Sequence, residues 1–252
     1  MNRLVRAEWY RLTHWKVLVR WMVIVFVVSI SMVIFLYGEE NIYAMPLSDF
    51  LTCTIDTYIM PFFMFFPAYI SVAIGMSYQY KTAYYEVMAG SRISHIVGSK
   101  IMVYAGSMTV LITLVYSGIF AFWGVKNGTG DLSRIPLRLV LFLVLVLHIC
   151  AVAVLMTTAV RHMVAVVMLI LYFNVIQGAI MIVINLLCDT SSAFYYRLCS
   201  WIPIAQLQLI GEAQHSAYVD TYLLFAMIAS MILDMGFWYA VSYIGMKKRL
   251  YR

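Results

Sequence analysis

The sequence predicts an all-α integral membrane protein with six transmembrane helices, and three observations support this fold class. Of the 252 residues, 64% are hydrophobic and only 11% are charged, whereas charged residues make up about a quarter of a soluble domain. The apolar residues fall in runs of about 20, the length that a helix needs to cross a bilayer. These runs are also too long and too continuously apolar for barrel strands. We therefore expect residues 1–252 to form a single transmembrane domain.

The first element in chain order is a basic amphipathic segment at residues 1–17, which lacks the cleavage site of a signal peptide. One arc of its helical wheel collects Leu4, Val5, Trp9, Leu12 and Trp15. This pattern predicts a helix in the membrane interface, either as a simple anchor or as an elbow that braces the first span. Glu8 falls inside the apolar arc, where a carboxylate needs a basic partner, and Arg92 is a candidate.

The six predicted spans set the orientation of the chain. They cover residues 18–37, 57–77, 98–123, 137–159, 163–187 and 221–246. An even number of spans puts both termini and the connections 78–97 and 160–162 on one side. Thirteen of the 17 basic residues lie on that side, so the positive-inside rule predicts cytoplasmic termini in the cell membrane. Because the net charge of +6 comes from residues beside apolar runs, we expect no nucleic-acid partner.

The connection at residues 78–97 is longer than orientation alone requires. It carries several charged side chains, and Tyr80, Tyr84, Val87 and Met88 recur at helical spacing. This spacing predicts a short amphipathic helix that offers one face to lipid headgroups or to another protein. The alternative is a solvated, positively charged turn that only fixes orientation.

Three of the predicted spans carry polar side chains near their centres. These are His148 in the fourth span, Asn174 and Gln177 in the fifth, and Asp234 in the sixth. Their similar depth predicts one polar cluster, at a translocation path or a dimer interface. Such a cluster can hold the helices together, or it can contact an ion or a substrate.

The outward connection at residues 188–220 contains two cysteines, Cys188 and Cys199, on either side of "DTSSAFYYRL". They can form a disulfide in an oxidising exterior, or they can remain free thiols. The following "WIPIAQLQLI" is apolar enough to dip into the outer leaflet as a re-entrant segment, or to lie on its surface.

Motifs for catalysis and for nucleotide binding are absent from the sequence. It contains no G-x-x-x-x-G-K-[ST], H-E-x-x-H, G-x-S-x-G or C-x-x-C pattern. We therefore expect no enzyme activity, metal or cofactor in this chain, with an unrecognised intramembrane active site as the less favoured alternative.

Several segments of the sequence match a known pattern. The segment "QYKTAYYEVMAGSRISHIVGSK" carries Lys81, Thr82, Gly90, Arg92 and Lys100. At these positions it resembles the loop between the second and third spans of the type-2 ABC exporter permeases. Gln79 replaces the usual acid and Ala83 the usual glycine, which leaves the subfamily open. The segments "RLVRAEWYRLTHWKV", "TTAVRHMVAVV" and "LCSWIPIAQLQLIGE" are similar to the family's first helix, its fourth-to-fifth turn and its outward segment.

The resemblance implies a permease subunit that forms a homodimer or heterodimer and docks two ATP-binding subunits. ATP and Mg²⁺ would be bound by those partners and not by this chain. The loop then acts as a coupling helix, with Lys81, Tyr84, Glu86, Met88 and Arg92 contacting the ATPase. The main alternative is a stand-alone secondary transporter that uses Asp234 and His148.

Overall fold

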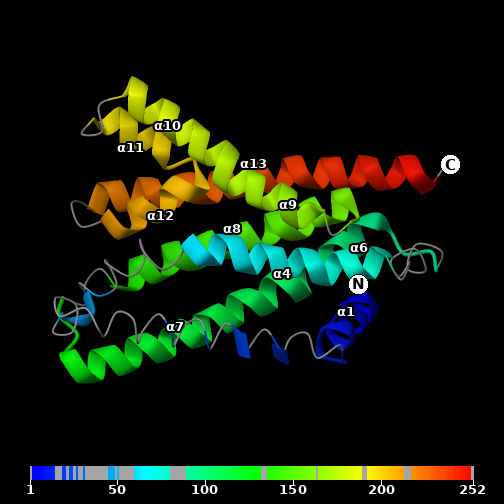
Figure 1. The fold of residues 1–252 in the computed structure, drawn as a ribbon, viewed down its shortest axis with the longest axis horizontal. Coiled ribbons are helices and arrows are strands. Elements are labelled where there is room, and N and C mark those ends of the chain that lie inside the picture. The colour runs from blue at the N-terminus through cyan, green and yellow to red at the C-terminus, as the bar shows by residue number, and fades with distance from the viewer. Residues whose placement is uncertain are drawn as a thin grey trace.

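The structure is a computed structural model of the chain. It describes residues 2–14, 45–48, 50, 60–79, 89–131, 135–162, 164–188, 192–212 and 217–250, and isolated positions between 19 and 31. Every regular element in these residues is a helix (Figure 1). The elements are α1 (Asn2–His14), α4 (Met60–Gln79), α6 (Ile93–Lys100), η1 (Ile101–Ala105), α7 (Gly106–Asn127), α8 (Ile135–Val160), α9 (Ala165–Ile170), η3 (Leu171–Ile176), α10 (Gln177–Leu187), α11 (Ala193–Cys199), α12 (Pro203–Glu212) and α13 (Ala217–Leu250). The predicted all-helical class is confirmed.

Four of the described helices are long and apolar enough to cross a membrane. They are Ile93–Asn127, Pro136–Val160, Ala165–Leu187 and Tyr222–Lys247. The first is built from α6, η1 and α7, and the third from α9, η3 and α10, where η1 and η3 are π-helical turns within continuous helices. Helix α4 occupies most of the predicted span 57–77. The predicted span 18–37 lies largely outside the described residues. These helices make the chain a membrane-embedded protein.

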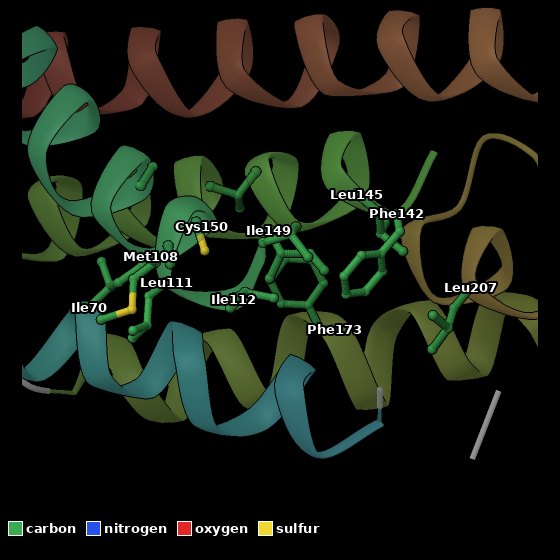
Figure 2. Close-up of a cluster of buried hydrophobic side chains, with 14 of the residues drawn as sticks. Ile70, Met108, Leu111, Ile112, Phe142, Leu145, Ile149, Cys150, Phe173 and Leu207 are labelled. Atoms are coloured by element: carbon green, nitrogen blue, oxygen red, sulfur yellow. The ribbon is translucent and has the colours of Figure 1, made fainter. Parts of the chain in front are cut away.

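Helix α8 forms the centre of the bundle. Every residue from Ile149 to Thr158 is buried, which explains why its sequence is apolar on all faces. Side chains from α4, α7, η3 and α12 pack around α8 in one continuous core (Figure 2). His148, which directly precedes Ile149, is buried in the same way.

The outer surface of the bundle is apolar. Large side chains on α7 and α13 point away from the core, and Leu114, Phe225 and Leu233 are each about two-thirds exposed, at 65%, 65% and 64%. A water-soluble protein rarely exposes such a continuous apolar surface, whereas lipid solvates it readily. These faces therefore suit contact with acyl chains.

The two ends of the bundle differ in content. Helices α1 and α6 lie at the end towards which α13 runs, while α11 and α12 lie at the opposite end (Figure 1). The predicted outward connection 188–220 thus contains two short helices. Helix α12 packs against α8, α10 and α13, and its residues Ala205, Leu207 and Ile210 are buried.

The disulfide considered from the sequence is not formed. Neither Cys188 nor Cys199 takes part in a disulfide bond. Cys199 is the last residue of α11, where it is buried with its Sγ 4.0 Å from Sδ of Met181 on α10. The helical course of α11 therefore directs the Cys199 thiol into apolar packing.

The proposed coupling segment is described only at its C-terminal end. Lys81, Tyr84, Glu86 and Met88 lie outside the described residues. Gly90 adopts a left-handed conformation with φ of +79°, which glycine tolerates better than other residues. Arg92 is exposed and is the N-cap residue of α6. The predicted turn therefore precedes the start of α6.

Candidate functional site

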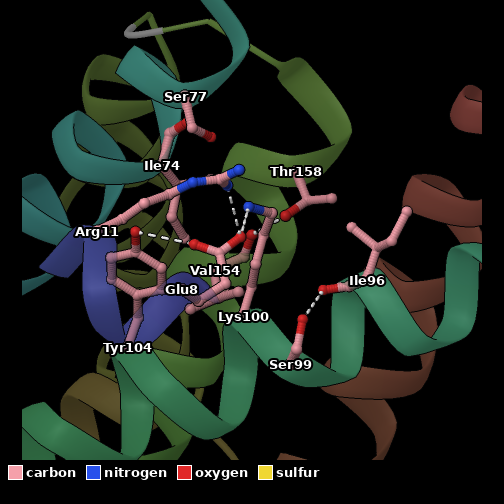
Figure 3. A network of polar contacts seen from close by, with 10 residues as sticks. All are labelled: Glu8, Arg11, Ile74, Ser77, Ile96, Ser99, Lys100, Tyr104, Val154 and Thr158. Carbon is pink, nitrogen blue, oxygen red and sulfur yellow. Dashed lines mark hydrogen bonds and ion pairs between the residues drawn. The ribbon is translucent and has the colours of Figure 1, made fainter. Parts of the chain in front are cut away.

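A buried polar network joins α1 to the helix that begins with α6. It consists of Glu8, Arg11, Lys100 and Tyr104, and is called the junction network below. The Glu8 side chain is 1% exposed and the Lys100 side chain is fully buried. Lys100 Nζ donates to Glu8 Oε1, Arg11 Nη1 lies 3.2 Å from the same oxygen, and the Tyr104 hydroxyl donates to Oε2 at 3.3 Å (Figure 3). One carboxylate thus has two cationic partners and a hydroxyl donor.

The positions of Lys100 and Tyr104 follow from their helix. Four residues separate them, so both side chains project from one face towards α1. Lys100 ends α6 and Tyr104 lies in η1. Lys100 Nζ also lies 5.8 Å from the centroid of the Tyr78 ring on α4, within cation–π range. The junction network therefore links α1 to the helix Ile93–Asn127, and Tyr78 of α4 contacts Lys100 beside it.

The basic partner of Glu8 differs from the one suggested by the sequence. Arg92 precedes the first turn of α6 and is exposed, whereas Lys100 lies two turns further along and faces α1. The predicted amphipathic helix is present as α1, with Leu12 buried and Trp9 50% exposed. Its apolar arc is therefore only partly used in packing against the bundle.

A second polar network lies at mid-membrane depth and consists of His148, Tyr172 and Asp234. His148 and Asp234 fall at the centres of the candidate spans Pro136–Val160 and Tyr222–Lys247. His148 Nε2 lies 3.1 Å from Asp234 Oδ2, and the Tyr172 hydroxyl donates to the same oxygen at 3.3 Å. The structure thus brings together two of the four polar residues singled out from the sequence.

The two ring nitrogens of His148 lie in different surroundings. Nε2 lies 3.1 Å from the Asp234 carboxylate oxygen. Nδ1 is buried and, among the described residues, has no hydrogen-bond partner. The contact with Asp234 is therefore the interaction that fixes the orientation of the imidazole.

The other two predicted cluster residues bind backbone groups. Gln177 is buried, and its Oε1 accepts from the Ile204 backbone N–H on α12 at 3.2 Å. The Asn174 side chain donates to the Ile170 carbonyl of its own helix at 3.1 Å. Gln177 therefore links its helix to α12, whereas the Asn174 amide is used within its own helix.

Two aromatic residues beside Asp234 were not singled out from the sequence. Tyr172 lies in the π-helical turn η3, and Trp238 follows Asp234 by one helical turn on α13. Their ring centroids are 6.0 Å apart with an interplanar angle of 87°. Aromatic residues in apolar runs resemble ordinary core residues. The only local signal was the four-residue spacing of Asp234 and Trp238, which places them on one helix face.

Together, the fold and the two networks define a membrane-embedded helical protein with one buried ion-pair network and one partly open carboxylate at mid-membrane depth. Comparisons with protein-family models, curated proteins and solved structures found no match for this chain. Among the described residues, no group of three or more His, Cys, Asp or Glu side chains could hold a metal ion.

Proposed function

We propose that this chain is the membrane-spanning permease subunit of an ATP-driven ABC exporter. The observation that carries the proposal is the junction network. In such a transporter, the cytoplasmic segment must transmit movement of the ATPase to the spans. Helix α6 begins at Ile93, within the C-terminal part of that segment, and Lys100 at its end is held to α1 through Glu8. A displacement of the segment would therefore move α1 and the following span together.

The complete assembly in this proposal contains two ATP-binding subunits and a second permease chain. Six spans put both termini on the same side of the membrane, and the basic residues beside the spans assign that side to the cytoplasm. The coupling surface consists of Lys81, Tyr84, Glu86, Met88 and Arg92, with aromatic and Met side chains in an ATPase groove and charged side chains at its rim. ATP and Mg²⁺ are bound by the partner subunits.

Co-purification tests this partnership. The chain is co-expressed with candidate ABC ATP-binding subunits from the same genome, as wild type and as the variants Tyr84→Ala, Met88→Ala and Glu86→Lys. Each variant should lower co-purified ATPase or its coupling to transport by about tenfold, as expected for interface anchors. Arg197→Ala is the matched control, because Arg197 is exposed on α11 at the opposite end of the bundle. Wild-type assembly and transport in all three variants would contradict the proposal.

A second candidate is a secondary transporter driven by an ion gradient, and the contact between His148 and Asp234 at mid-membrane depth favours it. Intramembrane ionisable residues commonly mark proton or ion pathways. The purified chain alone, reconstituted in liposomes, should then transport when an ion gradient is imposed, and Asp234→Asn should abolish this. Transport that depends on added ATPase and ATP would exclude this candidate.

A further inference from the structure

We infer that Asp234, Tyr172 and Trp238 form a binding site for a lipophilic organic cation, such as a hydrophobic amine or a quaternary ammonium compound. The inference names a class of substrate and so rests on the proposed transport function. It begins from the charge of the site. In the described part of the chain, the ion-pair partner of Asp234 is a single histidine, His148. Glu8, by contrast, is paired with a lysine and an arginine. The Asp234 carboxylate is therefore the less fully compensated of the two.

Access to the carboxylate supports a ligand at this position. The Asp234 side chain is 27% exposed, whereas that of His148 is 1% exposed. A carboxylate at mid-membrane depth is costly unless it faces protein, water or a cation. A cation that enters the site would therefore contact the exposed part of the Asp234 carboxylate.

The surroundings of Asp234 select the type of cation. Its neighbours Leu233 and Phe237 on α13 are large, apolar and exposed. A small inorganic ion would lose most of its hydration in such surroundings and gain only one carboxylate and a hydroxyl. A cation that carries its own apolar groups keeps favourable contacts with these side chains. The site therefore suits an organic cation better than a metal ion.

The aromatic side chains provide the remaining part of the site. Trp238 lies on the same face of α13 as Asp234, one turn away, and packs edge-to-face with Tyr172. Tyrosine and tryptophan rings attract ammonium groups through their electron-rich faces, and desolvation strengthens the attraction. A carboxylate counter-ion beside such rings is a recurrent chemistry for recognising organic cations.

The test compares two probes of similar shape and opposite charge, tetraphenylphosphonium and tetraphenylborate. Equilibrium binding is measured on the purified chain in nanodiscs of zwitterionic lipid, without ATPase. Saturable binding of the phosphonium ion is expected, and Asp234→Asn should weaken it about tenfold. Asp131→Asn, which neutralises an exposed acid in a loop, should bind like wild type. Trp238→Leu should weaken binding several-fold. Phe225→Leu should not, because Phe225 is an exposed aromatic residue nearer the start of α13.

Three outcomes would overturn the inference. They are equal binding of both probes to the wild type, unchanged phosphonium binding in Asp234→Asn, and displacement of the phosphonium ion by stoichiometric Na⁺ or K⁺. If Asp234→Asn assembles poorly, Asp234→Glu and Asp234→Gln are compared, because they share a length and differ in charge. The measurement involves no ATPase, so a failure to co-purify that subunit would contradict the proposed function and leave the cation site standing.

Discussion

The junction network and the mid-membrane network are built from similar parts but differ in how their charges are enclosed. Each has one carboxylate that accepts a tyrosine hydroxyl at 3.3 Å, and each tyrosine comes from a π-helical turn. Glu8 is 1% exposed and has two cationic partners, whereas Asp234 is 27% exposed and has one histidine. The comparison indicates that the first network holds the helices together, while the carboxylate of the second network is less enclosed and less fully paired among the described residues.

This difference has a simple physical origin. A buried carboxylate is tolerated when hydrogen bonds and opposite charges replace its hydration. Glu8 receives that replacement because docking of α1 buries its carboxylate against Lys100 and Tyr104. Asp234 lies on the partly exposed helix α13, so its hydration is replaced only on the side of His148 and Tyr172. The two networks should therefore respond differently to loss of a partner.

The largest effect is expected at the junction network. Lys100→Met leaves the buried Glu8 carboxylate with Arg11 and Tyr104 among its described partners, and removal of one partner of a buried ion pair costs about 3–5 kcal/mol. Unfolding free energy in detergent, together with protease cleavage after α1, measures the change. The double variant Lys100→Met with Glu8→Gln should recover most of the loss. If the double variant is as unstable as the single one, the ion pair is not what holds α1.

A smaller effect is expected when the mid-membrane pair is broken. His148→Leu removes one hydrogen bond to Asp234, and interhelical polar contacts in membranes contribute about 0.6–1.7 kcal/mol. The same unfolding measurement applies, with Asn174→Leu as the control because the Asn174 amide bonds within its own helix. A loss as large as that of Lys100→Met would show that Asp234 is as dependent on its partners as Glu8.

The smallest and sharpest comparison uses the two tyrosines. Tyr104→Phe and Tyr172→Phe each remove one hydroxyl donor at the same distance, and a typical hydrogen bond contributes about 0.5–1.5 kcal/mol net. Tyr104→Phe should be the more destabilising variant, since no water can replace its hydroxyl beside the buried Glu8. Paired unfolding measurements on the two variants check the order. Equal losses would mean that the difference in exposure has no energetic consequence.

Local sequence features predicted much of the architecture but only part of each network. Span length and hydropathy are local properties, which is why the predicted spans from 98 to 246 coincide with observed helices. Depth along a span similarly placed His148 level with Asp234. Asn174 was grouped with them because sequence does not show that an amide will bond to its own helix.

The partners of Glu8 and Asp234 were harder to predict because they depend on how helices approach one another. Glu8 in an apolar arc correctly indicated a need for a cation, yet Lys100 was interpreted as an orientation signal. Its complete burial results from the docking of α1, which no local pattern specifies. Tyr172 was overlooked for a related reason, since a tyrosine in an apolar span looks like core packing until its hydroxyl is seen on Asp234.

The π-helical turns also bear on which changes in chain length this protein can accept. A π-helical turn closes its hydrogen bonds over one more residue than an α-helical turn, so η1 acts as a one-residue insertion within the helix Ile93–Asn127. Deleting one residue from 101–105 would restore α-helical geometry and keep enough length to cross a bilayer. It would also rotate α6 by about 100° relative to α7. Lys100 would then turn away from Glu8 while α7 kept its packing, so a deletion that is silent in a hydropathy profile would uncouple α1 from the bundle.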